Sequence, residues 1–373
     1  MKLAAIDKAL NELKNGKSVI LTDHSEPAVR GSFVIAADNS DPDTVNQMIF
    51  YGRSPIKLAI SKEQYARLDL PDDESAQGSM QVSINASHGI GSGMSAADRN
   101  FTIKAASNNS ARPKDIVSPG HVFPIEVIEG GCLVKPLFAE AACDLVRLSG
   151  QGESAVICDI LNESGEHANE GELEILAAEL SLPICSIHDL IEYRFRHEPL
   201  VERINIVDLP TEYGNFRLHV YKARFDSSRG IDLALTFGKD IFEENDIPLV
   251  RVHSEWSIAN IVNRLSYEEG SFLNKAMKKV SESGGVGAII FLRNTPEQHT
   301  NSLFNHQKKP TDIWLENGYL KTLSPMGSNM SYGFGAQILR DLGVKRMNIL
   351  SNKETTFKGI DKFGLEILEQ IPF

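Results

Sequence analysis

Apolar residues recur at helical and strand intervals from the beginning of the chain. Over residues 3–15 they fall every three or four positions, which predicts a helix. The apolar runs SVILTD and FVIAAD then predict two strands on either side of a loop at 23–32. A helix that begins near Asp41 and a strand from Ile56 to Ile60 follow. Helices and strands are therefore mixed from the start.

The middle of the chain contains a predicted domain boundary. The run LEILAAELSLPICSIHDLIEYRFR has helical character in two pieces, which are interrupted before Pro183. Ser186, followed by Asp189, is the predicted cap of the second piece. The next run, INIVDLPTEYGNFRLHVYKARF, predicts two strands around a turn. We place the boundary near residue 200, which gives domains 1–199 and 200–373.

The second half continues with fewer elements. A helix at 270–283 and the buried strand VGAIIFLR are predicted, and the polar segment 294–332 is predicted to be a long loop. The length of 373 residues also favours two domains, each with its own core.

Composition excludes several classes of partner. The chain has 38 basic and 50 acidic residues, a formal net charge of −12, which argues against nucleic acid or an anionic membrane as the main partner. It has no signal-like or membrane-spanning apolar stretch, so we expect a soluble, cytoplasmic protein. Its four cysteines, which have no CxxC or Cys/His spacing, are predicted to be buried thiols: Cys132, Cys143, Cys158 and Cys185.

Three segments of the first domain, HGIGSGMSAADRNFTI, SPGHVFPI and AEAACDLVRL, resemble the 3,4-dihydroxy-2-butanone 4-phosphate synthase family of riboflavin biosynthesis. The resemblance covers roughly residues 3–200 and implies an α+β domain with a mixed sheet and flanking helices. Ser92, Ser95, Asp98 and Arg99 are candidate contacts to a phosphate or to sugar hydroxyls. Alternatively, Asp98 and Arg99 form an internal ion pair.

The family that the first domain resembles carries out a metal-dependent reaction. This sequence lacks the residues that would hold the metal. In the family, magnesium held by a glutamate and a histidine assists the conversion of ribulose 5-phosphate with loss of formate. The family's acidic loop, Arg-Glu-Asn-Glu-Gly-Asp, aligns with PAVRGS at 27–32, so the glutamate position is Ala28. The histidine position is Phe138. Neither side chain can ligate magnesium, so we predict no cofactor.

Other positions of that site differ as well. A cysteine near the family's substrate aligns with Lys57, an arginine with Lys135, and the essential glutamate with the shorter Asp159. His121 matches the family and either packs and hydrogen-bonds or contacts the ligand. Candidate catalytic residues are thus His121, Asp159 and Lys57. With Arg30 and His24 nearby in the alignment, the pocket is predicted to be more positive than in relatives and to bind a phosphorylated compound through Lys135, His24 and Arg30.

In the second domain, LVRVHSE and SYGFGAQILRDLGVKRMNILSN resemble GTP cyclohydrolase II, which implies a smaller α/β domain. That family holds zinc with three cysteines, but no cysteine follows Cys185 here. Further phosphate-contacting and catalytic positions are also replaced. The aligned residues are Trp256, Tyr267 and Glu269 for the zinc ligands, and Thr295, Pro296, Glu297, Ser328, Met330 and Thr356 for the others. Arg251, His253 and Glu255 remain, either as packed or ion-paired strand residues or as ligand contacts.

Three functions fit these residues. The first is a pseudoenzyme that binds a small phosphorylated metabolite or acts as a regulatory or scaffold dimer. The second is a repurposed metal-free enzyme that uses Lys57, Lys135, His121, Asp159 or His24 as acid/base or Schiff-base groups. The third is residual conversion of ribulose 5-phosphate to 3,4-dihydroxy-2-butanone 4-phosphate and formate. A homodimer is implied by the resemblance alone.

Overall fold

The computed structural model describes residues 2–24, 29–71, 82–224, 230–255, 269–283, 285–293, 333–351, 360 and 363–372. They belong to two compact units, Met1–Arg194 and Phe195–Phe373. The division therefore lies a few residues before the boundary that we expected near 200. Within the described residues, no helix is both long enough and apolar enough to cross a lipid bilayer.

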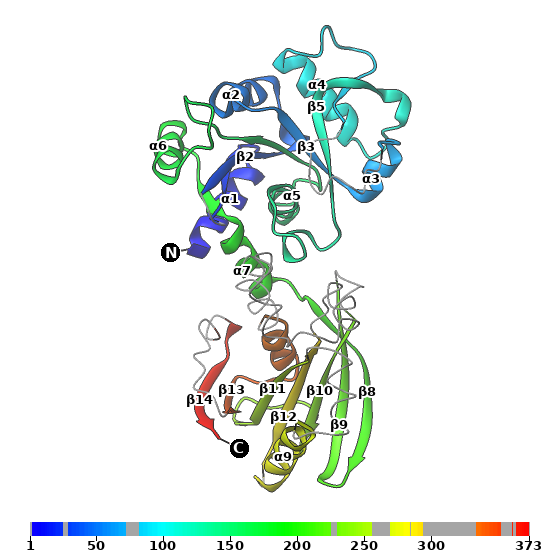
Figure 1. Ribbon diagram of the computed structural model, residues 1–373, viewed down its shortest axis with the longest axis vertical. Coiled ribbons are helices and arrows are strands. Elements are labelled where there is room, and N and C mark those ends of the chain that lie inside the picture. Colours follow the sequence, from blue (N-terminus) through cyan, green and yellow to red (C-terminus); the bar gives the residue numbers. More distant parts are fainter. Residues whose placement is uncertain are drawn as a thin grey trace, which may run out of the picture. The chain divides into compact units, whose positions relative to one another are not determined.

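The first unit is built on a seven-stranded mixed sheet in the order β4-β5-β3-β6-β2-β1-β7 (Figure 1). The pairs β1–β7 and β3–β5 are parallel, and the other neighbours are antiparallel. The strands are β1 (Val19–Asp23), β2 (Arg30–Ala36), β3 (Ile56–Ser61), β4 (Ile84–Ala86), β5 (Ile116–Val127), β6 (Ala155–Asp159) and β7 (Ile184–Ser186).

Helices cover both faces of this sheet. Helices α1 and α5 lie on one face, while α2, α4 and α6 pack on the other. Two predicted caps are confirmed, because Asp41 accepts from the Thr44 amide at 2.7 Å and Ser186 from the Asp189 amide at 3.0 Å. The helices are α1 (Lys2–Lys14), α2 (Pro42–Gly52), α3 (Lys62–Arg67), α4 (Ala96–Ser107), α5 (Phe138–Leu148), α6 (Glu170–Leu180) and α7 (Ile187–His197).

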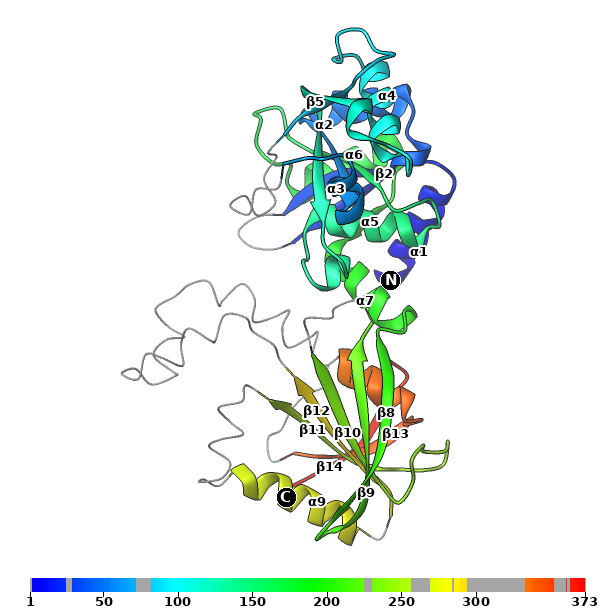
Figure 2. The ribbon, with the colours of Figure 1, turned by 90° about the vertical axis from the view of Figure 1, so that its right-hand side faces the viewer.

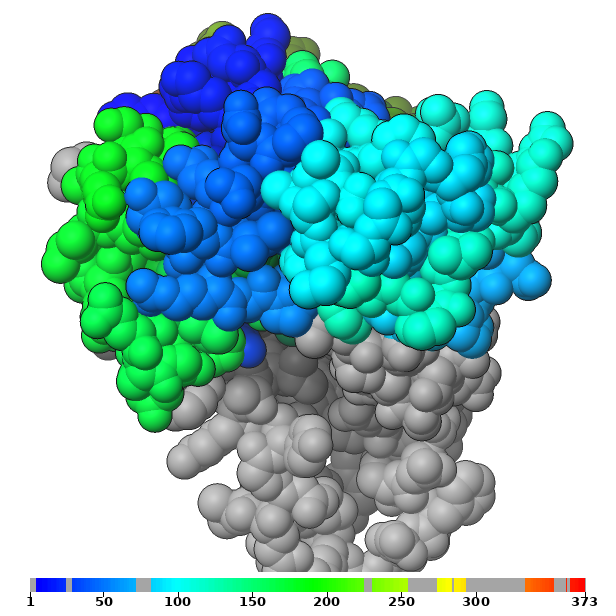
Figure 3. All heavy atoms as spheres, turned by 90° about the horizontal axis from the view of Figure 1, so that it is seen from above, coloured from blue at the N-terminus to red at the C-terminus, as the bar shows by residue number. Residues whose placement is uncertain are grey.

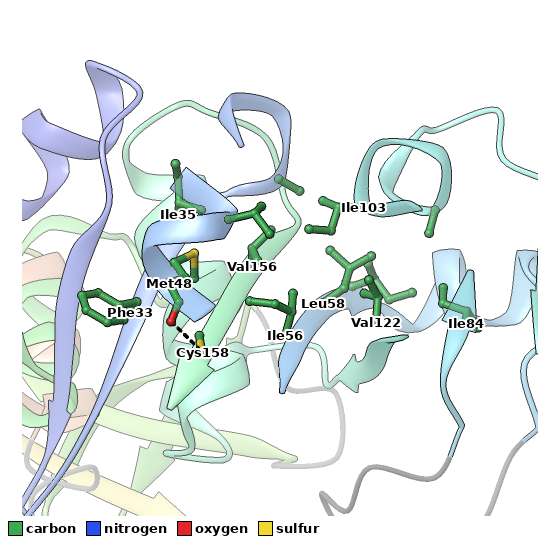
Figure 4. Packing of buried hydrophobic residues seen from close by; sticks show 14 of the residues in the cluster. Phe33, Ile35, Met48, Ile56, Leu58, Ile84, Ile103, Val122, Val156 and Cys158 are labelled. Atoms are coloured by element: carbon green, nitrogen blue, oxygen red, sulfur yellow. Dashed lines mark hydrogen bonds between the residues drawn. The ribbon is translucent and has the colours of Figure 1, made fainter. Parts of the chain in front are cut away.

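The apolar core beneath α2, α4 and α6 is shown in Figure 4. Alternate residues of the strands point into it, so Phe33 and Ile35 of β2 meet Met48 of α2. Cys158 lies in the same core, and its thiol donates to the Met48 carbonyl at 3.2 Å. The prediction of buried thiols is confirmed for all four cysteines, which are free and buried.

One segment of the first unit differs from its predicted conformation. The short strand β7 lies between α6 and α7, where the sequence predicts two helical pieces and a break. It pairs in parallel with β1 through Leu21 and Cys185 and forms one edge of the sheet. Three apolar residues after a proline give too little periodicity to identify a strand, so tertiary pairing with β1 decides its conformation.

The second unit also contains a seven-stranded mixed sheet, in the order β14-β13-β11-β12-β10-β9-β8. Figure 2 shows the long adjacent strands β8, β9 and β10 and helix α9 on one side of the sheet. The predicted hairpin, helix and buried strand are confirmed, whereas the predicted loop at 294–332 lies outside the described residues. The elements are β8 (Val201–Thr211), β9 (Gly214–Ala223), β10 (Ile231–Phe237), β11 (Leu249–Glu255), α9 (Glu269–Glu282), β12 (Gly287–Arg293), a helix at 333–341, β13 (Arg346–Leu350) and β14 (Glu366–Ile371).

Candidate functional site

Strand register brings several candidate residues of the first unit onto one face of the sheet. Phe33, Ile35, Ile56, Leu58 and Cys158 all point into the core beneath α2, α4 and α6. Because side chains alternate along a strand, their neighbours in sequence point to the opposite face, which α5 covers. These neighbours form a polar row across β3, β6, β2 and β1 that consists of Lys57, Asp159, Ser32, Arg30 and Asp23.

The centre of the row is a contact between Lys57 and Asp159. The Lys57 ammonium donates to Asp159 Oδ2. Ser32 lies opposite Asp159 in the register and donates its hydroxyl to Asp159 Oδ1 at 2.9 Å. The exposed fractions are 17% for the Lys57 side chain, 22% for the Asp159 side chain and 0% for Ser32, so the pair is largely withdrawn from water. Three polar side chains of the row thus meet in one hydrogen-bonded group.

Arg30 occupies the next part of the row. Its Nη2 donates to Asp23 Oδ2 at 2.8 Å, and its guanidinium carbon lies 5.8 Å from the centre of the Phe138 ring. This geometry is a cation–π contact, which stabilises a cation without supplying a metal ligand. The Arg30 side chain remains 42% exposed, so a solute can reach it.

Two other candidate cations lie at the ends of neighbouring segments. Lys135 Nζ is 3.6 Å from Glu140 Oε1 on α5, and burial raises the pKa of the Glu140 carboxyl. His24 is exposed, and its Nε2 lies 3.1 Å from Thr22 Oγ1. Ala28, the position expected for a metal-binding carboxylate, lies outside the described residues.

His121 lies on β5 and lines a pocket of about 480 Å³. Its backbone amide and its Nδ1 both face Asn85 Oδ1, at 3.0 and 3.3 Å. Because that oxygen accepts, Nδ1 is the protonated ring nitrogen in this arrangement. Arg53 and Arg99 contribute two cations to the lining. Phe123 belongs to the same lining and is the register partner of Lys57, so the pocket adjoins the polar row.

The glycine-rich loop before α4 is organised by Asp98. The Asp98 carboxylate accepts from the Gly91 and Gly93 amides at 3.0 Å each, and these bonds, the Gly91 bond foremost, lower the pKa of the carboxyl. Gly93 has φ +81°, and a Cβ there would lie 2.2 Å from the Asn85 side chain that holds His121. The loop is therefore built to close against Asn85.

The remaining residues of this loop also have local partners. Ser95 caps α4 by accepting from the Asp98 amide at 3.1 Å, and Ser92 accepts from the Met94 amide at 3.3 Å. Arg99 Nε donates to the Met94 carbonyl at 3.0 Å. Within the described residues Asp98 and Arg99 thus hold backbone groups of the loop, and no ion pair between them is found there.

The candidate residues of the second unit lie on β11. Arg251 donates to the Leu350 carbonyl at 2.9 Å and so joins β11 to the end of β13. His253 meets the Phe291 ring edge-on, with 5.9 Å between ring centres. Glu255 ends the strand. The aligned positions Trp256, Tyr267, Thr295, Pro296, Glu297, Ser328, Met330 and Thr356 lie outside the described residues, and Glu269 begins α9.

Sequence reasoning missed three partners that shape the site. Asp23, Asn85 and Glu140 hold Arg30, His121 and Lys135 respectively. Asp23 had a signal, because it is a charged residue at the end of the predicted strand SVILTD. The contact between Asn85 and His121 joins strands β4 and β5 and gave no signal, whereas Glu140 lies close to Lys135 in the sequence. Among the described residues, no group of three or more His, Cys, Asp or Glu could hold a metal ion.

Comparison with known proteins covers both units. Residues 7–193 match the family described as 3,4-dihydroxy-2-butanone 4-phosphate synthase, and residues 202–372 match GTP cyclohydrolase II. The chain is 34% identical over 386 residues to riboflavin biosynthesis protein RibBA of Aquifex aeolicus, covering 100% of this chain and 92% of that protein. It is 36% identical over 378 residues to the 3,4-dihydroxy-2-butanone 4-phosphate synthase of Pseudomonas aeruginosa, covering 100% of both.

A solved structure matches over almost the whole length. The crystal structure of RibBX, a two-domain 3,4-dihydroxy-2-butanone 4-phosphate synthase from A. baumannii, superposes with a TM-score of 0.73 and 30% sequence identity. The match covers 99% of each chain. The expected two-domain α+β architecture is therefore confirmed.

Proposed function

The chain belongs to the riboflavin-biosynthesis family that joins a 3,4-dihydroxy-2-butanone 4-phosphate synthase domain to a GTP cyclohydrolase II domain, and on this premise we propose that it binds a small phosphorylated metabolite without either metal-dependent reaction. The observation that carries the proposal is the Arg30 guanidinium stacked over Phe138. A cation and a phenyl ring occupy positions that align with family carboxylate and histidine groups.

The residues at this place do not fit a magnesium ion. Magnesium prefers oxygen ligands in octahedral geometry, and a phenyl ring supplies no donor atom. The fixed positive charge of Arg30 repels a second cation at short range. Asp23, the nearby carboxylate, already accepts from Arg30 at 2.8 Å. These contacts support binding without metal.

Two positive groups beside α5 support an anionic ligand. Arg30 and Lys135 are half-exposed cations near the first turn of α5, whose N-cap, Leu137, makes no side-chain cap. Backbone amides at such an N-terminus favour anions. The adjoining pocket contributes Arg53 and Arg99. A phosphate monoester matches this arrangement better than a neutral metabolite does.

For the second unit we propose a structural or regulatory role rather than zinc chemistry. A site of three thiolates needs cysteines, and the sequence has none after Cys185. Arg251 and His253 have partners within the sheet, which supports packing roles for both.

A homodimer is part of the proposal. On the face in Figure 3, α2 and α4 lie side by side. Phe50 on α2 is 68% exposed and Met94 before α4 is 61% exposed. An association that covers this face would remove both side chains from water, which is favourable. Sedimentation velocity would measure the oligomeric state, and a Phe50→Glu variant should shift it towards monomer.

Proton NMR of the protein with ribulose 5-phosphate and magnesium tests the absence of turnover. The Pseudomonas aeruginosa relative serves as the parallel reference. We expect no formate signal above the no-protein control over several hours. Formate release by this chain would overturn the proposal and establish the alternative function, conversion of ribulose 5-phosphate.

Ligand binding is tested separately by isothermal titration calorimetry. Inorganic phosphate and ribulose 5-phosphate are each titrated into the protein, first in a buffer that contains EDTA and then in one that contains magnesium. Binding of equal strength in both conditions is expected if Arg30 and its neighbours supply the positive charge. Binding that requires magnesium would contradict metal-free recognition.

A further inference from the structure

We propose that Lys57 forms a reversible imine with the carbonyl group of a small phosphorylated aldehyde or ketone, with Asp159 as its proton carrier. The inference rests on the proposed function, because the phosphate of the ligand is held by Arg30 of the polar row and by Lys135 near α5. The ligand then carries a carbonyl group as well as a phosphate, and it bonds covalently to Lys57. Such a reaction is one form of the metal-free enzyme that the sequence allows as an alternative.

The amine of Lys57 has a different environment from the amines of surface lysines. The amine contacts Asp159 Oδ2, and the Lys57 side chain is 17% exposed. Exposed lysines such as Lys62 have no such environment. Ser32, completely buried, donates to the other oxygen of Asp159 at 2.9 Å and fixes the plane of the carboxylate. A held carboxylate in contact with an amine is the arrangement that proton transfer in imine formation requires.

The reaction balances with the groups present. Asp159 takes one proton from the Lys57 ammonium, the freed nitrogen lone pair forms a C–N bond to the carbonyl carbon, and Asp159 returns the proton to the carbonyl oxygen. A second proton passes from nitrogen through Asp159 to the resulting hydroxyl, the C–O bond breaks, and water leaves. The product is an iminium with one N–H and one positive charge. No oxidant, reductant or metal is needed.

Charge conservation makes the imine compatible with the site. Ammonium and iminium both carry one positive charge, so Asp159 keeps an opposite charge beside it throughout. An acylated Lys57 would be neutral and would leave the largely buried carboxylate unpaired, which is costly. The site therefore favours carbonyl compounds over acyl donors.

The position of Arg30 sets the size of the ligand. Strand β6 lies between β3, which carries Lys57, and β2, which carries Arg30. Neighbouring strands are about 4.8 Å apart, so the two backbones are separated by about 10 Å. A compound of three to five carbons with a terminal phosphate can place its carbonyl at Lys57 and its phosphate towards Arg30.

Reductive trapping tests the proposal on the full-length protein. Dihydroxyacetone phosphate is incubated with the protein and sodium cyanoborohydride, which reduces an iminium to a stable secondary amine, and modified lysines are identified by peptide mass spectrometry. Lys57 should be modified at least tenfold more than Lys62. Unphosphorylated dihydroxyacetone should modify Lys57 less, because it lacks the phosphate.

Two variants provide the controls. Lys57→Arg keeps the positive charge and the pairing with Asp159 but cannot form an imine, so trapping at position 57 should vanish while phosphate binding remains. Asp159→Asn should slow trapping at Lys57 at least tenfold, since it removes the proton carrier. Wild-type trapping at Lys57 no greater than at Lys62, with phosphate binding intact, would overturn the imine and leave the proposed function standing. Trapping at Lys57 without phosphate binding would support the imine and contradict the proposed function.

Discussion

At the scale of single residues, the first-unit site contains one connected polar group. Ser32, Lys57 and Asp159 are joined by hydrogen bonds. A largely buried lysine needs a partner for its charge. Asp159 provides it, because register brings β3 and β6 together with these side chains on one face.

Arg30 is predicted to be the strongest single contributor to anion binding. Replacing it by glutamine removes the charge but keeps a polar side chain of similar length. Since a hydrogen bond to a charged group contributes about 1.5–3 kcal/mol, affinity for inorganic phosphate should fall roughly tenfold or more. Calorimetric titration measures the change. Lys62→Gln, a surface control, should leave the affinity unchanged, and equal losses in both variants would show a non-specific effect of net charge.

His219 is predicted to make the second unit sensitive to acid. It is completely buried; burial first and then Arg203 lower the pKa of its imidazole. Arg203 can only donate, so Nδ1 accepts from it at 3.3 Å and Nε2 carries the proton towards Thr236, 3.0 Å away. In the unfolded chain the imidazole has a pKa of about 6.5, so below this pH it binds a proton that it does not bind in the folded unit. The free energy of unfolding therefore decreases as the pH falls from about 6.5 towards the lower pKa of His219 in the folded unit.

The check is a comparison of urea unfolding at pH 7.5 and 5.5. His219→Gln cannot titrate, so it should lose less stability between these two values than the wild type does. NMR titration of the His219 ring protons would confirm the direction of the shift. An equal loss of stability in both proteins would mean that other groups cause the acid sensitivity.

At the scale of elements, α5 and α7 are joined by a buried ion pair. Arg194 donates to Asp144 Oδ2 at 2.7 Å, and the side chains are only 5% and 7% exposed. Arg194 also donates to the Gly130 carbonyl at 2.8 Å, and Asp144 accepts from the Cys132 amide at 2.8 Å. The pair therefore fixes the turn at 130–133 as well as the two helices.

Arg194→Met should cost the first unit about 3 kcal/mol of unfolding free energy, because it leaves Asp144 buried without its cation. Urea unfolding of the full chain, followed at a first-unit probe, measures the loss. The double variant Arg194→Met with Asp144→Leu should recover part of it, since no charge is then left buried. Failure to recover would show that the hydrogen bonds to the turn, rather than the charge balance, carry the stability.

Sequence patterns predicted the elements with strong periodicity and missed those decided by distant contacts. Strands β1, β2 and β3 and the caps at Asp41 and Ser186 follow from local signals. Strand β7 does not, because three residues gain their conformation only by pairing with β1. The site divides in the same way. The alignment identified Lys57 and Asp159 separately, but their contact depends on pairing between β3 and β6, and the Asn85 bond to His121 joins residues 36 positions apart.

At the scale of the whole molecule, each unit has its own sheet and its own apolar core. A unit that buries its own core can fold without the other. All four cysteines belong to the first unit, and all four are buried. Burial raises the pKa of the Cys185 thiol to about 12, and it also raises the pKa of the other three thiols. Thiol reactivity in the full chain therefore reports on the first unit alone.

We expect Ellman's reagent at pH 8 to modify none of the four thiols in the native full-length protein and all four in concentrated urea, because only an exposed thiolate reacts. A fragment of residues 1–199, which contains the complete first sheet and α7, should protect the same thiols and lose that protection at nearly the same urea concentration. If thiol reactivity rises at the same urea concentration in the fragment and in the full-length protein, the stability of the first unit comes from its own core. A fragment with reactive thiols in buffer would show instead that the first unit needs the second in order to fold, and the second unit would then have a structural role that its sheet alone does not reveal.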